Sequence, residues 1–285
     1  MKKRKLFLSL ISLMLFSSVL FTACGNKGNN TESEAAEKTA SETSASSEAT
    51  KKTSENQSET SVQSGTDKSE AQNSQDSNEP ADMSFFDDAV FVGDSVTMGL
   101  KNYVNSQRNS GVDCLGEARF LTAGSMSYTN SLFEIGAENS IHPTYQGKEV
   151  RIEDGLKTME AKKVFIMLGM NDFCIIPHDM AMDNVQKTVD NILEKNPDAE
   201  IYIQSVTPTL NDSGSFCNAN IREFNDGLKE LCTKNSLTYV DVASVTSDSN
   251  GVLIASYCSD PEDRGVHFTY DGCKAWVDYL CKEFC

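Results

Sequence analysis

Ala89-Val90-Phe91-Val92-Gly93-Asp94-Ser95 is the stretch of sequence that decides the fold. Four apolar residues run into a glycine, and two polar residues follow. A short apolar run that ends at a glycine is typical of a β-strand buried on both faces. The residues that come next, 96–107, predict a helix. A buried strand that leads directly into a helix is the opening unit of a parallel α/β sheet, and we expect further units along the chain.

The rest of the domain repeats this unit. Further strands are predicted at 120–123, 163–168, 200–206 and 237–242, and further helices at 154–160, 179–195, 219–235 and 271–283. Because strands alternate with helices and several strands are continuous apolar runs, the sequence predicts an α/β fold. Its central parallel sheet should be covered by helices on both faces.

Three polar segments directly follow predicted strands. They are Gly93-Asp94-Ser95, Gly124-Ser125 and Gly169-Met170-Asn171-Asp172. In a parallel sheet the carboxyl ends of the strands meet at one edge, and ligands bind in the crevice outside that edge. The sequence therefore predicts a single site at which these three segments come together.

Ser95, Asn171 and His267 could supply a nucleophile, an oxyanion donor and a base. Ser95 opens a helix, where backbone N–H groups could stabilise the oxyanion that its attack would produce, although serine is also a common N-cap residue. Asn171 could donate to the same oxyanion, or it could only shape its loop through an Asx turn. His267 precedes the last helix and can reach this edge as a base, whereas His142 and His178 are expected in loops.

The segments together resemble the SGNH (GDSL) hydrolase family. Residues 91–95 match its first block, Gly124 its second, 169–172 its third and 267–269 its last, in the family's order. The resemblance spans the whole domain. It implies a flavodoxin-like three-layer αβα sandwich, which agrees with the strand and helix order.

The resemblance also implies roles for single residues. Ser95 is then the nucleophile of an acyl-enzyme reaction, and His267 is the general base. Ser95, Gly124 and Asn171 supply the oxyanion hole. No CxxC pair or cluster of cysteine and histidine suggests zinc, and we expect neither a metal nor another cofactor.

The carboxylate that orients the histidine is less well defined. The family usually carries Asp three residues before its histidine, and this chain has Arg264 there. We predict that Asp263, one residue earlier, accepts the Nδ1–H of His267. The alternatives are Asp260, which lies on the other side of Pro261, and a backbone carbonyl group. Arg264 should turn away, since a cation beside the ring disfavours the imidazolium.

The amino terminus predicts export. Basic residues at 2–5 and an apolar run at 6–21 indicate a signal peptide over residues 1–23. Thr22-Ala23-Cys24 resembles the lipobox of bacterial lipoproteins, in which the cysteine is lipidated. Cys24 would then anchor the protein to the bacterial cell membrane from outside the cytoplasm. An ordinary signal peptide cleaved near Ala23 is the alternative.

The composition changes sharply after the signal peptide. Residues 24–82 are rich in Ser, Thr and Glu, and Val62 is their only large apolar side chain, so this stretch predicts a lipidated cysteine followed by a disordered tether. Residues 83–285 form the predicted hydrolase-like domain.

The formal net charge of −17 argues against a nucleic-acid partner, because phosphate binding needs a basic surface. The eight cysteines beyond Cys24 could form disulfides or remain free thiols.

These features predict an extracytoplasmic serine esterase. An enzyme outside the membrane meets glycans and cell-wall polymers, so we expect it to cleave small acyl groups such as O-acetyl from carbohydrate. A lipase or lysophospholipase of the same family, a non-catalytic glycan- or solute-binding lipoprotein and a degenerate hydrolase are the alternatives. An α/β-hydrolase is disfavoured because Ser95 lacks the second glycine of G-x-S-x-G. The oligomeric state is left open.

Overall fold

The computed structural model describes residues 82–285 of the 285-residue chain. The predicted signal peptide, Cys24 and nearly all of the predicted tether lie outside the described residues, so lipidation and disorder remain predictions. None of the helices in the described part is long and apolar enough to cross a membrane.

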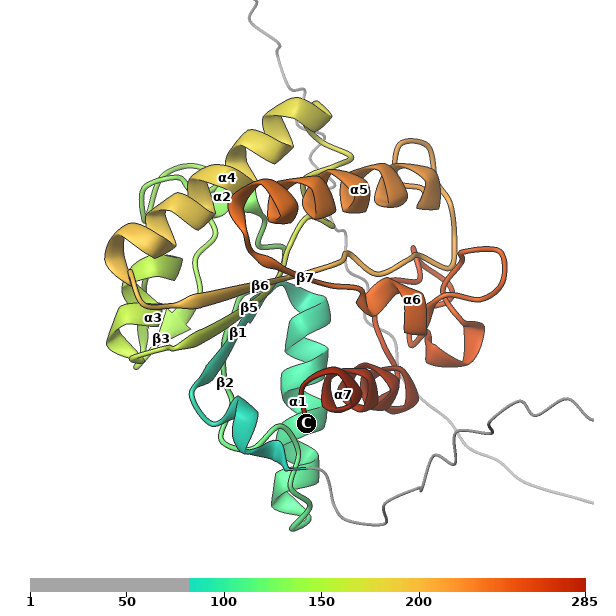
Figure 1. The fold of residues 1–285 in the computed structure, drawn as a ribbon. Coiled ribbons are helices and arrows are strands. Elements are labelled where there is room, and N and C mark those ends of the chain that lie inside the picture. Colours follow the sequence, from blue (N-terminus) through green and yellow to red (C-terminus); the bar gives the residue numbers. More distant parts are fainter. Residues whose placement is uncertain (1–81) are drawn as a thin grey trace, which may run out of the picture. The chain divides into compact units, whose positions relative to one another are not determined.

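A five-stranded parallel sheet forms the centre of the domain (Figure 1). Its strands lie in the order β2-β1-β5-β6-β7. They are β1 (Ala89–Gly93), β2 (Arg119–Thr122), β5 (Lys163–Met167), β6 (Glu200–Gln204) and β7 (Thr238–Val240). The order changes direction at β1, which is the first strand of the described domain and lies between β2 and β5. A short antiparallel pair, β3 (Thr144–Tyr145) and β4 (Lys148–Glu149), lies outside this sheet.

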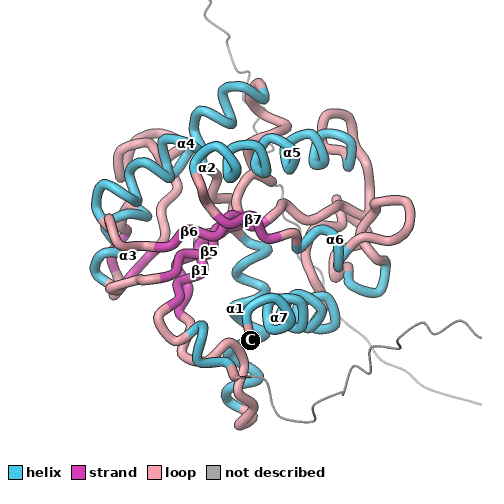
Figure 2. The backbone as a smooth tube through the Cα atoms, in the orientation of Figure 1, coloured by secondary structure: helices cyan, strands magenta, loops and turns pink. Residues whose placement is uncertain are grey.

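Helices cover both faces of the sheet, as the sequence predicts. Figure 2 shows the sheet between α4 and α5 on one side and α1 and α7 on the other. The helices are α1 (Ser95–Asn109), α2 (Tyr128–Ser131), α3 (Ile152–Thr158), α4 (His178–Lys195), α5 (Asn218–Asn235), α6 (Val242–Thr246) and α7 (Tyr270–Phe284). Two 3-10 turns, η1 (Met83–Phe86) and η2 (Ala255–Tyr257), complete the described elements. The predicted three-layer αβα sandwich is confirmed.

Strand β1 contributes to both layers of the core because successive side chains of a strand point to opposite faces. Val90 and Val92 pack in the cluster formed with α3, α4 and α5. Phe91 packs in the cluster formed with α1 and α7, where its ring stacks on Phe165 of β5 with centroids 4.7 Å apart. Every residue of β1 is buried, which explains why the sequence shows a continuous apolar run instead of an alternating one.

The predicted strands and longer helices are all present, with ends shifted by a few residues. The predicted strand 237–242 is too long, because the side chain of Asp241 caps α6 and ends the extended segment. The sequence did not predict α2, α6 or the β3–β4 pair. These elements span only two to five residues each, too few for a hydrophobic period to be visible.

The eight cysteines of the described part are free thiols. Burial raises the pKa of Cys114 and of Cys232 to about 11. A buried thiol that stays protonated behaves as a small apolar side chain. Of the two possibilities that the sequence left open for these cysteines, disulfides or free thiols, the described domain shows free thiols.

Candidate active site

Ser95 stands at the junction between β1 and α1. Strand β1 ends at Gly93, and Asp94 is the N-cap of α1, where its Oδ1 accepts the backbone N–H of Val96 at 2.9 Å. The capping role that serine often plays is therefore taken by Asp94. This leaves the Ser95 hydroxyl free to contact His267, near the other end of the sequence.

His267 connects Ser95 to a carboxylate. Its Nε2 lies 2.9 Å from the Ser95 Oγ, although the two residues are 172 positions apart in the sequence. Its Nδ1 lies 2.7 Å from Oδ2 of Asp260. An ionised carboxylate can only accept at Nδ1, so the proton of the neutral ring belongs there and the Nε2 lone pair faces the hydroxyl. Ser95 and His267 come together as predicted.

The prediction that Asp263 orients His267 is wrong. Asp260 accepts twice, from the Nδ1–H of the ring and from the backbone N–H of His267 at 3.0 Å. Asp263 is exposed, and its backbone carbonyl accepts from the side chain of Asn211 at 2.8 Å. The alternative acid, Asp260, therefore occupies the position that the sequence assigned to Asp263.

Backbone pairing explains this exchange. Cys258 forms an isolated antiparallel bridge with Phe268, and the N–H of Ser259 donates to the carbonyl of His267 at 2.9 Å. The chain leaves this pairing at Asp260, which places the carboxylate opposite the histidine. Residues 261–265 form a loop that returns through Gly265 at φ 71°. Spacing along the sequence misleads here because the intervening residues bulge outward.

Arg264 lies within this loop. Its guanidinium packs over the ring of Phe216, 4.7 Å from the centroid. Its backbone carbonyl accepts the N–H of Asn211 at 3.1 Å. This position agrees with the prediction that Arg264 turns away from His267.

The pKa of Asp260 is lowered. Partial burial alone would raise it, but the hydrogen bonds from the ring and backbone of His267, together with the charge of the imidazolium, outweigh burial. The thiol of Cys258 adds a weak contact to Oδ1 at 3.5 Å. Asp260 therefore remains a carboxylate over the pH range in which a histidine can act as a base.

Asn171 and Gly124 lie at the same sheet edge. The amide nitrogen of Asn171 lies 3.1 Å from Oδ2 of Asp94 and 3.2 Å from the carbonyl oxygen of Met126. Gly124 follows β2, and its neighbour Ala123 donates a backbone hydrogen bond to the carbonyl of Gly93 at 3.2 Å. Gly124 borders open space, since an added Cβ would meet no atom within 4 Å. The three predicted segments thus meet as expected.

Two buried carboxylates that sequence reasoning passed over hold these segments in place. Asp94 binds the Asn171 amide as described, and Asp172 accepts from the backbone N–H groups of Tyr128 and Thr129, each at 2.9 Å. Asp172 thereby fixes the amino end of α2 to the loop after β5. Both aspartates stand inside blocks that the sequence analysis had singled out, directly beside Ser95 and Asn171. An acid next to a predicted site residue at a strand end was the available signal.

Burial raises the pKa of Asp94 to about 6, against the hydrogen bond from Val96 and the charge of His267, which lower it. An acid whose folded-state pKa exceeds its unfolded value of 3.8 stabilises the fold at low pH, and this contribution is lost as the pH rises through 6. We expect the free energy of unfolding of the wild type, relative to Asp94→Asn, to fall by about 2 to 3 kcal/mol between pH 4 and pH 7.

Urea unfolding followed by the fluorescence of Trp276, the only tryptophan and fully buried, measures this difference. Asp94→Asn is the matched reference because it keeps the shape and removes the titration. Contributions from groups that do not interact with Asp94 cancel in the comparison. A difference in the free energy of unfolding between the two proteins that stays constant from pH 4 to pH 7 would contradict the raised pKa of Asp94.

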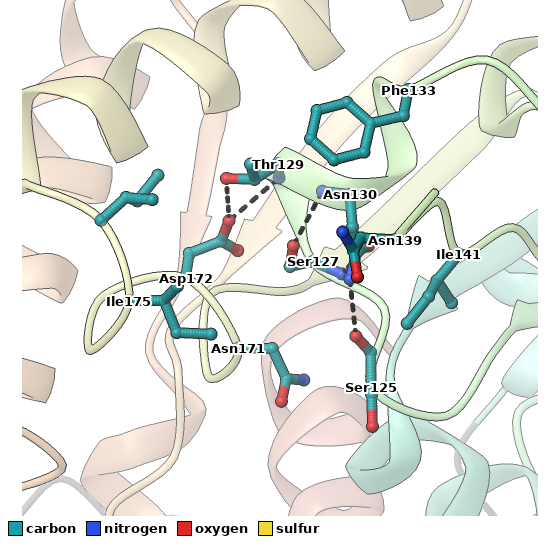
Figure 3. A pocket seen from close by; sticks show the side chains of 11 residues that line it. Ser125, Ser127, Thr129, Asn130, Phe133, Asn139, Ile141, Asn171, Asp172 and Ile175 are labelled. Carbon is teal, nitrogen blue, oxygen red and sulfur yellow. Dashed lines mark hydrogen bonds between the residues drawn. The ribbon is translucent and has the colours of Figure 1, made fainter. Parts of the chain in front are cut away.

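A pocket of about 510 Å³ opens beside Asn171 (Figure 3). Its walls come from residues 125–141, between β2 and β3, and from residues 171–176, after β5. Figure 3 shows Phe133 and Ile141 on one side of the hollow and Ile175 on the other. The candidate active site therefore has a pocket next to its predicted oxyanion donor.

Residues 91–275 match the model of the GDSL-like lipase/acylhydrolase family. A GDSL-like lipase from Bacteroides thetaiotaomicron is 15% identical with a TM-score of 0.51, over 69% of this chain and 86% of that one. A Bacteroides fragilis protein with the provisional name of acylhydrolase is 19% identical with a TM-score of 0.52, over 69% and 85% of the two chains. At these identities the likeness concerns the fold. No curated protein matches the sequence.

The family match covers well over half of the chain. It includes Ser95, Gly124, Asn171 and His267, on which the resemblance in the sequence depends, and it includes Asp260. The chain therefore belongs to the GDSL-like lipase/acylhydrolase family and is, at the level of that family, an ester hydrolase.

Proposed function

We propose that the protein is a serine-dependent carboxylic ester hydrolase with Ser95 as nucleophile, His267 as general base and Asp260 as the orienting acid. The observation that carries this proposal is the continuous line from Asp260 to His267 at 2.7 Å and from His267 to Ser95 at 2.9 Å. A nucleophile within hydrogen-bond reach of a base that a third group orients is the arrangement that activates a serine hydroxyl.

The reaction follows from these contacts. His267 Nε2 takes the Oγ proton while Ser95 attacks the carbonyl carbon, and the carbonyl oxygen becomes an oxyanion. The backbone N–H groups of Ser95 and Gly124 and the amide of Asn171 are the proposed donors to it. His267 then gives its proton to the leaving alcohol, which leaves an acyl-enzyme on Ser95. A water molecule, activated by His267 in turn, releases the acid.

The side chain of Asn171 is already oriented for this role by two hydrogen bonds. Its amide nitrogen already donates to Asp94 and to Met126, so the side chain is oriented before a substrate arrives. Binding of an oxyanion would replace the Met126 contact while the buried carboxylate of Asp94 keeps the amide in place. A donor that is already oriented needs little reorganisation at the moment of reaction.

The non-catalytic alternatives gain no support. A glycan- or solute-binding module has no need for a hydroxyl, an imidazole and a carboxylate in one hydrogen-bonded line. The degenerate-hydrolase alternative arose from the misplaced Asp263, and Asp260 fills that position in the described domain. Catalysis is the simpler account of three side chains from distant parts of the sequence.

Location and substrate are the finer parts of the proposal. We propose that Cys24 is lipidated, that residues 25–82 tether the domain, and that the enzyme acts outside the cytoplasm. The sequence favours an O-acetyl ester of carbohydrate because such esters occur there. The apolar pocket beside Asn171 favours a second candidate, an ester with a longer acyl group, as expected for the lipase alternative.

Fractionation of bacterial cells that express the full chain tests reaction and location together. Wild type should carry hydrolysis of p-nitrophenyl acetate into the membrane fraction. Cys24→Ser should move that activity out of the membrane fraction, because the protein would then lack the acyl chains that anchor it. Ser95→Ala should remain in the membrane fraction and lose the activity.

The two parts of the proposal fail separately in this experiment. Cys24→Ser protein of mature size that stays in the membrane fraction would contradict lipid anchoring alone. Ser95→Ala protein that keeps its activity would contradict the serine mechanism alone.

A further inference from the structure

We infer that the pocket beside Asn171 binds the acyl part of the ester, and that this part is an apolar chain of medium length, about eight carbons, instead of acetyl. The inference rests on the proposed function, since it assigns the pocket from the direction of the proposed reaction. It concerns a property of this chain, namely the size and polarity of the walls formed by residues 125–141 and 171–176.

The position of the pocket relative to the two reacting groups assigns it to the acyl side. The leaving alcohol must take its proton from Nε2 of His267, so it departs on the histidine side of the scissile carbonyl. Within the described domain, the pocket is lined by the Ser125 and Asn171 segments, and the loop 258–269 that carries His267 contributes nothing to it. The substituent that enters the pocket is therefore the one on the oxyanion side, away from the alcohol.

Four of the seven polar side chains that line the pocket are engaged with one another, namely those of Ser127, Thr129, Asn130 and Asp172. Asp172 accepts from the hydroxyl of Thr129 at 2.6 Å, and Ser127 and Asn130 form a reciprocal capping box at the start of α2. Asn130 also donates to the carbonyl of Ser125 at 2.9 Å, as Figure 3 shows. A polar ligand would have to break these bonds to make its own. Among the polar side chains of the lining, only those of Ser125 and Asn139 have no such partner, so a sugar ring with many hydroxyls would find fewer partners here than hydroxyls to satisfy.

Apolar side chains supply the remaining surface. Phe133 is 40% exposed and Ile175 is 73% exposed, while Ile141 and Ile176 are half-buried. Large apolar groups that line a concave site without a cover mark a place where burial of an apolar ligand is favourable. An acyl chain would cover Phe133 and Ile175 from solvent.

The volume distinguishes a longer chain from acetyl. About 510 Å³ lies within the range of small-molecule sites, roughly 300–1,000 Å³. At about 30 Å³ for a water-sized group, the pocket has room for more than ten such groups. The single methyl group of an acetyl ester would leave nearly all of it to water. A chain of about eight carbons fills much more of the available volume.

Hydrolysis of a matched ester series tests the inference. With the purified full chain, kcat/KM for p-nitrophenyl octanoate should exceed that for p-nitrophenyl acetate at least tenfold. Ile141→Trp, which fills the pocket, should lower the octanoate-to-acetate ratio of kcat/KM at least tenfold. Phe133→Ser, at a partly exposed position, should lower the same ratio.

Val112→Trp is the control. Val112 is a half-exposed apolar residue outside this pocket, at the turn after α1, so the octanoate-to-acetate ratio should stay that of the wild type. A wild type that cleaves acetate through Ser95 but prefers it to octanoate, or an Ile141→Trp protein that loses both esters equally, would overturn the inference and leave the proposed function intact. A protein that cleaves no ester at all would overturn both.

Discussion

Ser95→Ala and His267→Ala should each lower kcat for ester hydrolysis by several orders of magnitude, on the order of 10⁴ to 10⁶. The double variant should be little worse than either single one. Both effects follow from the 2.9 Å contact between His267 Nε2 and Ser95 Oγ. A hydroxyl without its base is a weak nucleophile at neutral pH, and a base without the hydroxyl has no proton to take.

The near-equality of the double variant is the sharper part of this prediction. Residues that act as one unit lose their whole contribution when either is removed, so their effects do not add. Independent contributions would instead multiply, and the double variant would be slower by the product of the two single effects. Activity that remains in all three variants would come from the oxyanion donors and from substrate binding.

Stopped assays with a chromogenic ester on the purified variants measure these values. A fold control is available, because the side chain of Asp94, and not that of Ser95, caps α1. Removal of the Ser95 hydroxyl should therefore leave the thermal midpoint of unfolding close to that of the wild type. Ser95→Ala protein with wild-type turnover would refute the nucleophile assignment.

The sheet could be predicted from the sequence because its strands are buried on both faces. A segment such as 89–93 must then be apolar throughout, and that signal does not depend on the rest of the protein. The meeting of Ser95, Gly124 and Asn171 was predictable for the same reason, since parallel strands bring their carboxyl ends to one edge. These predictions needed only the order of the elements.

The acid of the site could not be predicted in this way. Its position depends on how the loop 258–269 pairs with itself, through the bridge between Cys258 and Phe268 and the bond between Ser259 and His267. No period in the sequence announces an isolated bridge. The pocket was equally hidden, because α2 and the long loop after it place Phe133 and Ile141 by tertiary contacts. Spacing in the sequence measures separation along the chain, whereas both features depend on which residues the fold brings into contact.

Asp260→Asn should lower kcat by up to about 10⁴, whereas Asp263→Asn should keep turnover near that of the wild type. The asparagine at position 260 can still accept the backbone N–H of His267, as Oδ1 of Asp260 does at 3.0 Å, so the loop should hold its shape. Its amide nitrogen, however, would face Nδ1 of the ring, where Asp260 now accepts at 2.7 Å.

An amide N–H that donates to Nδ1 forces the ring proton onto Nε2, which then points a donor at the Ser95 hydroxyl instead of a lone pair. Catalysis fails through the tautomer and not through the fold, so kcat should fall while the thermal midpoint of unfolding changes little. Asp263→Asn is the matched control, since it makes the same chemical change three residues away on an exposed side chain. Normal turnover in Asp260→Asn together with loss in Asp263→Asn would restore the acid that the sequence favoured. Normal turnover in both variants would mean that Ser95 and His267 act as a dyad, with Asp260 only bracing the loop through the backbone of His267.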